Sequence, residues 1–347
     1  MKAKIISLFN HKGGVSKTTT TFNLAWKLTQ LGKRVLLVDA DSQCNLTGMM
    51  MGDDFENYYT NESTKLMNLM DGARSAFTGK PMPIEAIDCY QTAQNERLFL
   101  IPGHMNISEF EPTLSLALSS NNAISTLQNL PGAFYELIRL CCIKYDIEYV
   151  FVDLNPGLSA INQVFFVYCD YFIVPTNPDP FSVMAINTLK NILPRWKKWA
   201  LSNREYFDEA SYPLPLSEMK FIGAIIQRFS LRSGTAAKSF QQRIGEIKMN
   251  IDKNLVSELK KFDMVIDSSY LNNNGQTKNY CIAEISEFGA LLQSAHDAGV
   301  PVFALSDGQI GRSGSVLDQM QKNRERFSDI FEEIANLVIK VCDDQSI

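Results

Sequence analysis

NHKGGVSKTT, residues 10–19, stands between two segments of different character. The preceding run, Ile5–Asn10, is short and mostly apolar, as in a buried strand. The following segment, Lys17–Leu31, repeats apolar residues at the spacing of a helix and ends before Gly32. Glycines between a strand and a helix let backbone N–H groups curl around phosphate oxygens, and the helix N-terminus adds partial positive charge. The segment therefore predicts a strand, a phosphate-binding loop and a helix, in that order.

Apolar runs of strand length recur along the rest of the chain, and helical stretches separate most of them. These runs are Arg34–Asp39, Leu98–Ile101, Tyr149–Val152, Tyr171–Val174, Phe221–Ile226 and Val300–Leu305. Strands that alternate with helices favour a parallel sheet, because a parallel connection needs a crossover. We expect an α/β fold with a doubly wound, mostly parallel sheet flanked by helices.

Three segments interrupt this alternation, near residues 50–97, 199–217 and 268–278. The first is acidic, with eight Asp and Glu against four Lys and Arg. The other two carry prolines or a cluster of turn-forming residues. We interpret all three as insertions in a single domain that spans residues 1–347.

Composition excludes several classes of protein. The chain has 347 residues, of which 45% are hydrophobic and 20% charged, so it is neither disordered nor fibrous. Its 33 Lys and Arg against 38 Asp and Glu give a net charge of −5, which excludes a globally basic nucleic-acid coat but not a local basic face. Seven scattered cysteines without a CxxC pair suit reduced thiols, so we expect a cytoplasmic protein.

The glycine loop departs from the standard phosphate loop, G-x-x-x-x-G-K-[ST], at two positions. His11 and Ser16 stand where that pattern has glycine, and Lys12 adds a second lysine early in the loop. The resulting K-G-G-x-x-K-[ST] resembles the deviant Walker A motif of the ParA/MinD family of P-loop ATPases. Other segments that resemble family landmarks are Val38–Gln43, Leu100–Gly103, Tyr149–Gly157, Val174-Pro175 and Gly299–Phe303.

The resemblance implies a P-loop NTPase fold and hydrolysis of ATP with Mg²⁺. Lys17 would reach the β- and γ-phosphates, and Asp41 would polarise the attacking water. Lys12 would act catalytically in the partner's site of a homodimer that forms on ATP binding. The residues expected to contact the nucleotide are Lys12, Gly13, Gly14, Val15, Ser16, Lys17, Thr18, Thr19 and, near the adenine, Gln227. The residues expected to arrange Mg²⁺ are Thr18, Asp39 and Asp153.

Simpler interpretations of two of these residues remain open. A carboxylate that ends a buried strand, such as Asp39, is often only a helix cap. Gln227 can equally be an ordinary residue at the end of a strand.

The charge is unevenly distributed, and two segments are basic. Residues 190–204 hold five Lys and Arg and no Asp or Glu, and residues 220–261 hold nine against three. A basic stripe binds the phosphate backbone without reading the base sequence, and ParA proteins bind DNA in this way as ATP dimers. We therefore expect non-specific DNA binding, and with it association with the nucleoid. The candidate contacts are Arg232, Lys238, Arg243, Lys248 and Lys253. The alternative is an ordinary solvated helix face.

The last predicted helix, Phe327–Val341, carries an apolar stripe that distinguishes two branches of the family. MinD-like proteins end in a basic helix that lies on anionic lipid. Here residues 327–347 hold five Asp and Glu and only Lys340, which anionic lipid would repel. We expect the stripe to pack on the sheet, and no association with a membrane.

Three functional hypotheses follow. The first is a ParA-like ATPase for DNA partition or intracellular positioning, stimulated by a ParB-like or other activating partner. The second is a similar ATP switch in another regulatory or defence complex, without DNA binding. The third is a P-loop metabolic enzyme that acts on a small molecule.

Overall fold

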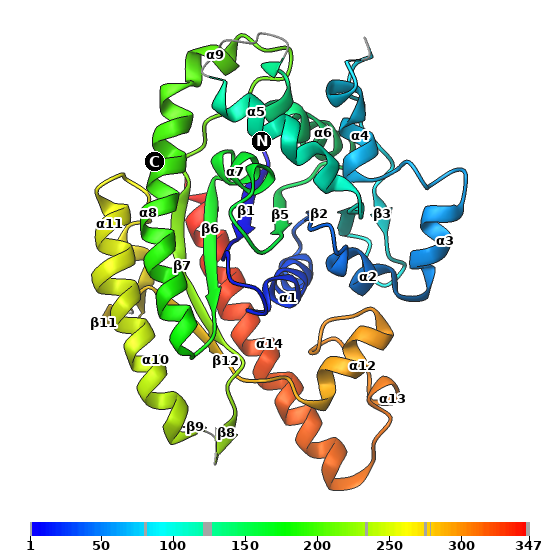
Figure 1. The fold of residues 1–347 in the computed structure, drawn as a ribbon. Helices are drawn as coiled ribbons and strands as arrows, with labels where there is room; N and C mark the ends of the chain where they lie inside the picture. Colours follow the sequence, from blue (N-terminus) through cyan, green and yellow to red (C-terminus); the bar gives the residue numbers. More distant parts are fainter. Residues whose placement is uncertain are drawn as a thin grey trace.

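The computed structural model describes residues 2–79, 82–120, 127–232, 235–273, 276–277 and 279–344. Its centre is an eight-stranded sheet in the order β12-β7-β6-β1-β5-β2-β4-β3 (Figure 1). The strands are β1 (Lys4–Leu8), β2 (Val35–Ala40), β3 (Tyr90–Gln91), β4 (Leu98–Ile101), β5 (Tyr149–Leu154), β6 (Tyr171–Thr176), β7 (Lys220–Gln227) and β12 (Cys281–Ile285). All neighbours pair in parallel except β3 and β4. The predicted fold class is therefore confirmed.

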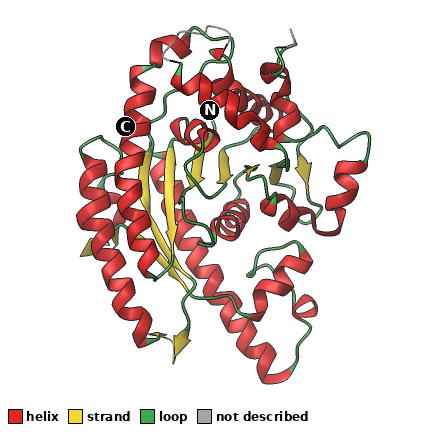
Figure 2. Cartoon of the chain, in the orientation of Figure 1, coloured by secondary structure: helices red, strands yellow, loops and turns green. Residues whose placement is uncertain are grey.

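Helices cover both faces of this sheet (Figure 2). The α-helices are α1 (Lys17–Gln30), α2 (Asn45–Met51), α3 (Phe55–Thr60), α4 (Leu69–Phe77), α5 (Glu111–Ser119), α6 (Leu130–Tyr145), α7 (Ala160–Val167), α8 (Pro180–Ser202), α9 (Arg204–Asp208), α10 (Lys238–Asn250), α11 (Ser257–Lys260), α12 (Ala290–Ala298), α13 (Asp307–Ile310) and α14 (Gly314–Asp343). A π-helical turn, Ile251–Val256, joins α10 to α11. Short 3-10 turns lie at Gly52–Asp54, Ile107–Phe110 and Ser268–Leu271. Two small hairpins, β8 (Leu231–Arg232) with β9 (Thr235–Ala236) and β10 (Asn272–Asn273) with β11 (Gln276–Thr277), lie apart from the main sheet.

The helices fall into two layers because parallel crossovers are right-handed. The chain moves in opposite directions along the sheet from β1 to β2 and from β5 to β6, which places α1 and α7 on opposite faces. α14 packs beside α1, whereas α6, α7 and α8 contact one another in series. Buried apolar residues from both layers form one continuous core around the sheet.

The central strands position the site. β1 lies between β5 and β6, and every residue of β2, β5 and β6 is buried. Asp39 at the end of β2 lies opposite Asp153 at the end of β5. The loop after β1 and both carboxylates therefore meet at the carboxyl edge of the sheet, where ligands bind in folds of this type.

One predicted strand is wrong, and two strands of the main sheet, β3 and β12, were not predicted. Val300–Leu305 forms turns, with the Ala304 N–H donating to the Pro301 carbonyl over 2.9 Å. The sheet instead ends at β12, whose residues are mostly only half-buried and include Glu284. An apolar run predicts burial, which Val300 and Val302 do show, but not extended backbone.

The apolar stripe of the last helix packs inward, as predicted. α14 contacts α1 and β12, and Phe327, Phe331, Ile334 and Val338 are fully buried. In the described part of the chain, no helix is both long and apolar enough to cross a bilayer. All seven cysteines are free thiols.

Candidate nucleotide-binding site

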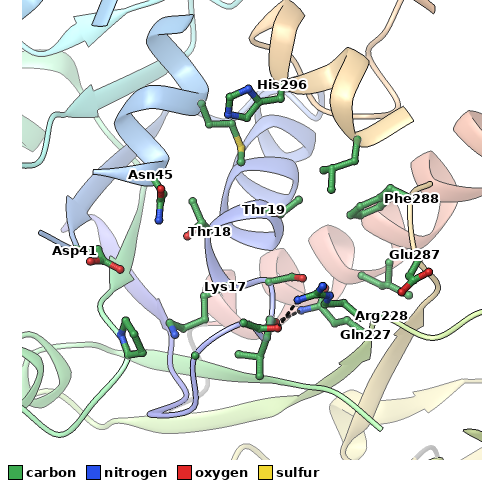
Figure 3. Close-up of a pocket in the computed structure, with 18 of the residues that line it drawn as sticks. Lys17, Thr18, Thr19, Asp41, Asn45, Gln227, Arg228, Glu287, Phe288 and His296 are labelled. Carbon is green, nitrogen blue, oxygen red and sulfur yellow. Dashed lines mark hydrogen bonds between the residues drawn. The ribbon is translucent and has the colours of Figure 1, made fainter. Parts of the chain in front are cut away.

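A cavity of about 680 Å³ opens at the carboxyl edge of the sheet, above the N-terminus of α1 (Figure 3). Residues from the loop after β1 line its floor, and residues after β2 and β7 line its sides. It brings together nearly all the residues predicted to contact nucleotide, together with the predicted catalytic carboxylate. These are Gly13, Gly14, Val15, Ser16, Lys17, Thr18, Thr19, Gln227 and Asp41.

The loop has the left-handed turns that a phosphate loop needs. Gly14 has a φ of 70° and Ser16 a φ of 57°, a region that L-residues rarely adopt. The Lys17 ammonium donates to the carbonyls of Asn10 and Lys12 over 3.2 and 3.5 Å, so the side chain curls back along its own loop. Asn10 in turn donates to the Pro175 carbonyl of β6, which fixes the start of the loop.

Lys17 lies within the field of two carboxylates. Burial lowers the pKa of its ammonium, and Asp153 and Asp41 oppose that shift. The arrangement places the Lys17 ammonium at the floor of the cavity, where phosphate oxygens need neutralisation.

The carboxylate of Asp153 is buried at the end of β5. The residue is 1% exposed, and neither carboxylate oxygen has a partner among the described residues. Burial and the charge of Asp39 raise the pKa of Asp153 to about 8, against the opposing effects of Thr18 and Lys17. Buried oxygens without a hydrogen-bond partner are rare in proteins and indicate that a ligand binds there. A carboxylate and a neighbouring threonine hydroxyl provide the oxygen ligands that Mg²⁺ prefers. Thr18 and Asp153 therefore fit a magnesium site.

Asp39 differs from Asp153 because the chain itself satisfies its oxygens. Its Oδ2 accepts hydrogen bonds from the backbone N–H and the hydroxyl of Thr47 over 2.8 and 2.7 Å. Its Oδ1 accepts from the backbone N–H of Asp41 over 3.2 Å. Burial raises the pKa of Asp39 to about 6. Asp39 therefore braces the segment that carries Asp41, which itself faces the cavity.

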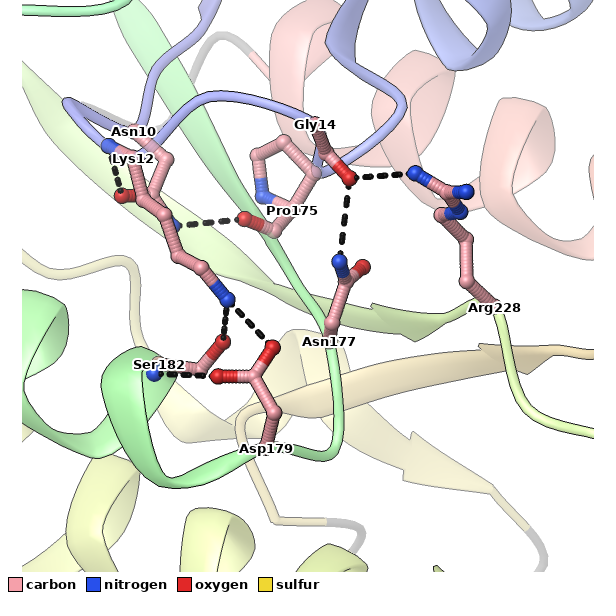
Figure 4. A network of polar contacts seen from close by, with 8 residues as sticks. All are labelled: Asn10, Lys12, Gly14, Pro175, Asn177, Asp179, Ser182 and Arg228. Atoms are coloured by element: carbon pink, nitrogen blue, oxygen red, sulfur yellow. Dashed lines mark hydrogen bonds and ion pairs between the residues drawn. The ribbon is translucent and has the colours of Figure 1, made fainter.

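The end of β7 braces the loop from the other side. The Gln227 amide accepts from the Thr20 hydroxyl over 2.8 Å and donates to the Val15 carbonyl over 3.1 Å. The Arg228 guanidinium donates to the Gly14 carbonyl over 2.8 Å (Figure 4). Gln227 thus lies in the predicted region, but both ends of its amide are engaged by the loop and α1.

Sequence reasoning missed an apolar wall of the cavity. Met49 of α2, Phe288, and Leu292 and His296 of α12 line it. Figure 3 shows Phe288 and Asp41 on opposite sides of the N-terminus of α1. The segment after β12 carries no motif, so its approach to the loop is a consequence of the tertiary fold.

Lys12 does not line the cavity. Its ammonium instead contacts the carboxylate of Asp179 and donates to the Ser182 hydroxyl over 2.9 Å (Figure 4). Asp179 is the N-cap of α8 and accepts from the Ser182 backbone N–H over 2.9 Å. The predicted dimer residue is therefore held by its own chain.

The predicted DNA contacts fall into two groups. Lys238 and Lys253 are exposed on α10 and the turn that follows it. Arg243 and Lys248 are ion-paired with Glu246 and Glu284, which reduces the positive charge that they offer. The Arg232 side chain lies outside the described structure.

α8 packs beside α10 and adds further basic residues, Lys190, Arg195 and Lys198. The indole of Trp196 is buried against Phe9 and Phe166 and has a packing role.

Comparison with known proteins identifies the family. A model of the AAA domain family AAA_31 matches residues 3–204. The sporulation initiation inhibitor protein Soj of Bacillus subtilis is 27% identical over 195 residues, which cover 54% of this chain and 64% of Soj. The chain belongs to the ParA/MinD family of P-loop ATPases.

Other similarities extend over more of the chain. The protein MJECL24 of Methanocaldococcus jannaschii is 26% identical over 240 residues, 69% of this chain and 78% of that protein. The structure of pNOB8 ParA bound to nonspecific DNA has a TM-score of 0.57 at 19% identity and covers 99% of this chain and 100% of that one. The structure of a Cyanothece McdA variant in complex with ATP has a TM-score of 0.58 at 18% identity and covers 95% and 96%. At these identities the two structures show that the fold is shared.

Proposed function

We propose that this ParA/MinD-type chain binds ATP with Mg²⁺ and hydrolyses it to ADP and phosphate. The observation that carries the proposal is the convergence of Lys17, Thr18 and Asp41 on one open cavity, with the buried carboxylate of Asp153 close enough to Lys17 to affect its pKa. The McdA variant, which shares this fold, was solved in complex with ATP, and this supports the same ligand for the present chain.

Each residue has a role that its surroundings allow. Lys17 neutralises charge on the phosphates, and backbone N–H groups of the loop bind the remaining oxygens. Thr18 and Asp153 would hold Mg²⁺, which when bound would supply positive charge to the phosphates. Asp41 orients the attacking water, and Asp39 holds the Asp41 segment in place. The apolar wall around Phe288 contacts the adenine base of ATP.

We propose further that ATP binding produces a face-to-face homodimer that binds DNA non-specifically until a partner protein stimulates hydrolysis. Exposed lysines on α10 and the following turn, and basic residues of α8 beside them, support this role, as does the fold shared with DNA-bound pNOB8 ParA. The chain would then act in the cytoplasm, on nucleoid DNA, in partition or intracellular positioning. In this proposal residues 1–347 form one ATPase domain with three insertions.

A second candidate is the same ATP switch acting on a protein partner without DNA. The ion pairs of Arg243 and Lys248 favour it, because paired side chains contribute less to phosphate binding.

Gel retardation of DNA by the purified chain with ATP, with ADP and without nucleotide separates these candidates. The proposal expects retardation only with ATP, indifferent to base sequence and weakened by salt as counterion release requires. Lys17→Ala, which removes phosphate neutralisation, is expected to abolish it.

Two other outcomes have definite meanings. ATP-dependent dimerisation without retardation would support the second candidate. Unchanged nucleotide binding and hydrolysis in Lys17→Ala would overturn the assignment of the loop.

A further inference from the structure

A chain of hydrogen bonds connects a surface helix to the carboxylates of the site. It begins at Tyr59 on α3, within the acidic segment 50–97, where the phenol hydroxyl donates to the Gly103 carbonyl over 2.6 Å. The Gly103 N–H donates to the Thr47 hydroxyl over 2.9 Å. That hydroxyl donates to Asp39 over 2.7 Å, and Asp39 accepts from the Asp41 N–H.

The middle of this chain of hydrogen bonds is tightly packed. Gly103 follows β4, and a Cβ at this position would lie 3.1 Å from the carboxyl carbon of Asp39 and from the Cys44 sulfur. A side chain here would push these neighbours by a few tenths of an ångström, so glycine favours the close approach of the backbone to the buried carboxylate. Tyr59 and Thr47 therefore clamp Gly103, one at its carbonyl and the other at its N–H.

Asp39 helps to hold the segment that carries Asp41. Asp39 is fully buried, and apart from Thr47 its carboxylate binds only the Asp41 N–H among the described residues. A shift of Thr47 would therefore shift the carboxylate that holds Asp41 at the cavity. Interactions of this kind hold catalytic groups in productive geometry, where displacements well under 1 Å alter rates.

We propose that Tyr59 is a positioning residue for ATP hydrolysis, acting through Gly103, Thr47 and Asp39 on Asp41. The inference rests on the proposed ATPase function. It also assigns a role to segment 50–97: α3 lies at the edge of the molecule, far along the sheet from β1, yet one of its side chains reaches the hydrolytic machinery (Figure 1).

The chain provides a matched control in the adjacent residue. The Tyr58 hydroxyl also donates to a backbone carbonyl, that of Met67, over 2.8 Å, but Met67 lies within the same segment and outside the chain of hydrogen bonds to Asp39. Tyr59→Phe and Tyr58→Phe therefore each delete one hydroxyl and one hydrogen bond from the same helix. Equal structural effects are expected, with a difference only in the chemical step.

The experiment measures phosphate release by the full-length wild-type chain and both variants over a range of ATP concentrations. For Tyr59→Phe we expect kcat to fall roughly 3- to 10-fold, the loss that corresponds to one hydrogen bond. KM for ATP is expected to stay within about 2-fold, because the phosphate loop that binds the nucleotide is outside this chain of hydrogen bonds. Tyr58→Phe is expected to keep both values.

A double-mutant cycle tests whether Tyr59 acts through Thr47. Thr47→Val removes the hydroxyl that binds Asp39, so adding Tyr59→Phe to it should lower kcat little further. Full additivity would overturn the inference, as would equal kcat values for Tyr59→Phe, Tyr58→Phe and the wild type. A wild-type chain without any ATP hydrolysis would instead overturn the proposed function, and the inference with it.

Discussion

Ser16 stores backbone strain in the phosphate loop. Its φ of 57° lies in the left-handed region, and its side chain makes no capping hydrogen bond to α1 in return. Glycine relieves about 1–2 kcal/mol of this strain, and its greater freedom in the unfolded chain offsets about 0.4–1 kcal/mol. Ser16→Gly should therefore raise the free energy of unfolding by about 0.5 kcal/mol and keep nucleotide binding.

The β-branched variant Ser16→Val provides the opposite change. It should lower the free energy of unfolding by more than about 1 kcal/mol, because branching at Cβ worsens the contact with the backbone. Urea denaturation of the three proteins measures both effects. Equal stability of all three would mean that the loop relaxes out of the left-handed region.

Asp153 should destabilise the nucleotide-free chain. Burial raises its pKa to about 8, so between its ordinary value near 4 and about 8 the unfolded chain releases a proton that the folded chain keeps. Stability associated with this group is therefore lost as pH rises through that window. Asp153→Asn removes the effect and should be more stable than the wild type by about 2 kcal/mol at pH 8, with the difference shrinking toward pH 4.

Thermal unfolding with EDTA and without nucleotide checks this expectation. The same variant should lose Mg²⁺-dependent hydrolysis, so stability and activity move in opposite directions. A variant less stable than the wild type at every pH would mean that Asp153 is ionised and stabilised by Lys17.

Among individual residues, the sequence predicted best where a motif dictates backbone geometry. Residues 13–19 all line the cavity because their order along one loop fixes their positions. Asp39 and Asp153 look alike in sequence, each ending an apolar strand, yet Thr47 satisfies one and no described residue satisfies the other. That difference depends on tertiary contacts which no local pattern encodes.

Among the elements, α8 begins at a residue with two roles. Asp179 caps the helix through the Ser182 N–H and also binds Lys12, the residue expected to act across the dimer. Asp179→Ser keeps a capping oxygen but removes the carboxylate, whereas Asp179→Ala removes both. The alanine variant should lose about 1 kcal/mol of stability and the serine variant much less.

Both Asp179 variants remove the carboxylate that holds Lys12, which leaves only the hydrogen bond to the Ser182 hydroxyl among its side-chain contacts in the described structure. Because a partly exposed ion pair is worth up to about 1 kcal/mol, ATP-dependent dimerisation should strengthen by up to about 5-fold in each. Sedimentation velocity over a range of protein concentrations measures this. Weaker dimerisation in both would mean that Asp179 is itself part of the interface.

Strands were predicted correctly where a buried apolar run is also extended, in the interior of the sheet. They were not predicted correctly at its edge. Leu98–Ile101 was predicted to the residue because an entirely buried four-residue run has few alternatives to a strand. β12 was not predicted, because its sequence CIAEI is neither a continuous apolar run nor a regular alternation of polar and apolar residues.

For the whole molecule, exposed apolar side chains near the phosphate loop support a dimer that closes over it. Phe181 and Met184, at the start of α8, are 70% and 66% exposed, and Phe181 lies between the two residues that bind Lys12. Leu158, two residues after Pro156 on the cavity wall, is 44% exposed. Side chains of this size rarely gather at a surface without a partner.

Phe181→Glu tests that arrangement, and the same helix offers its control. A charge at the centre of a dimer interface is costly, so ATP-dependent dimerisation should be lost, while the monomer keeps its stability within about 0.5 kcal/mol because the side chain is exposed. Leu201 is 55% exposed near the other end of α8, about 30 Å away along the helix. Leu201→Glu should therefore dimerise normally.

Light scattering with ATP and nucleotide binding should be measured on both variants, because loss of the dimer with nucleotide affinity intact places Phe181 at the interface. Normal dimerisation of Phe181→Glu would mean that the subunits meet through a different face, and that Lys12 does not cross to the partner beside α8.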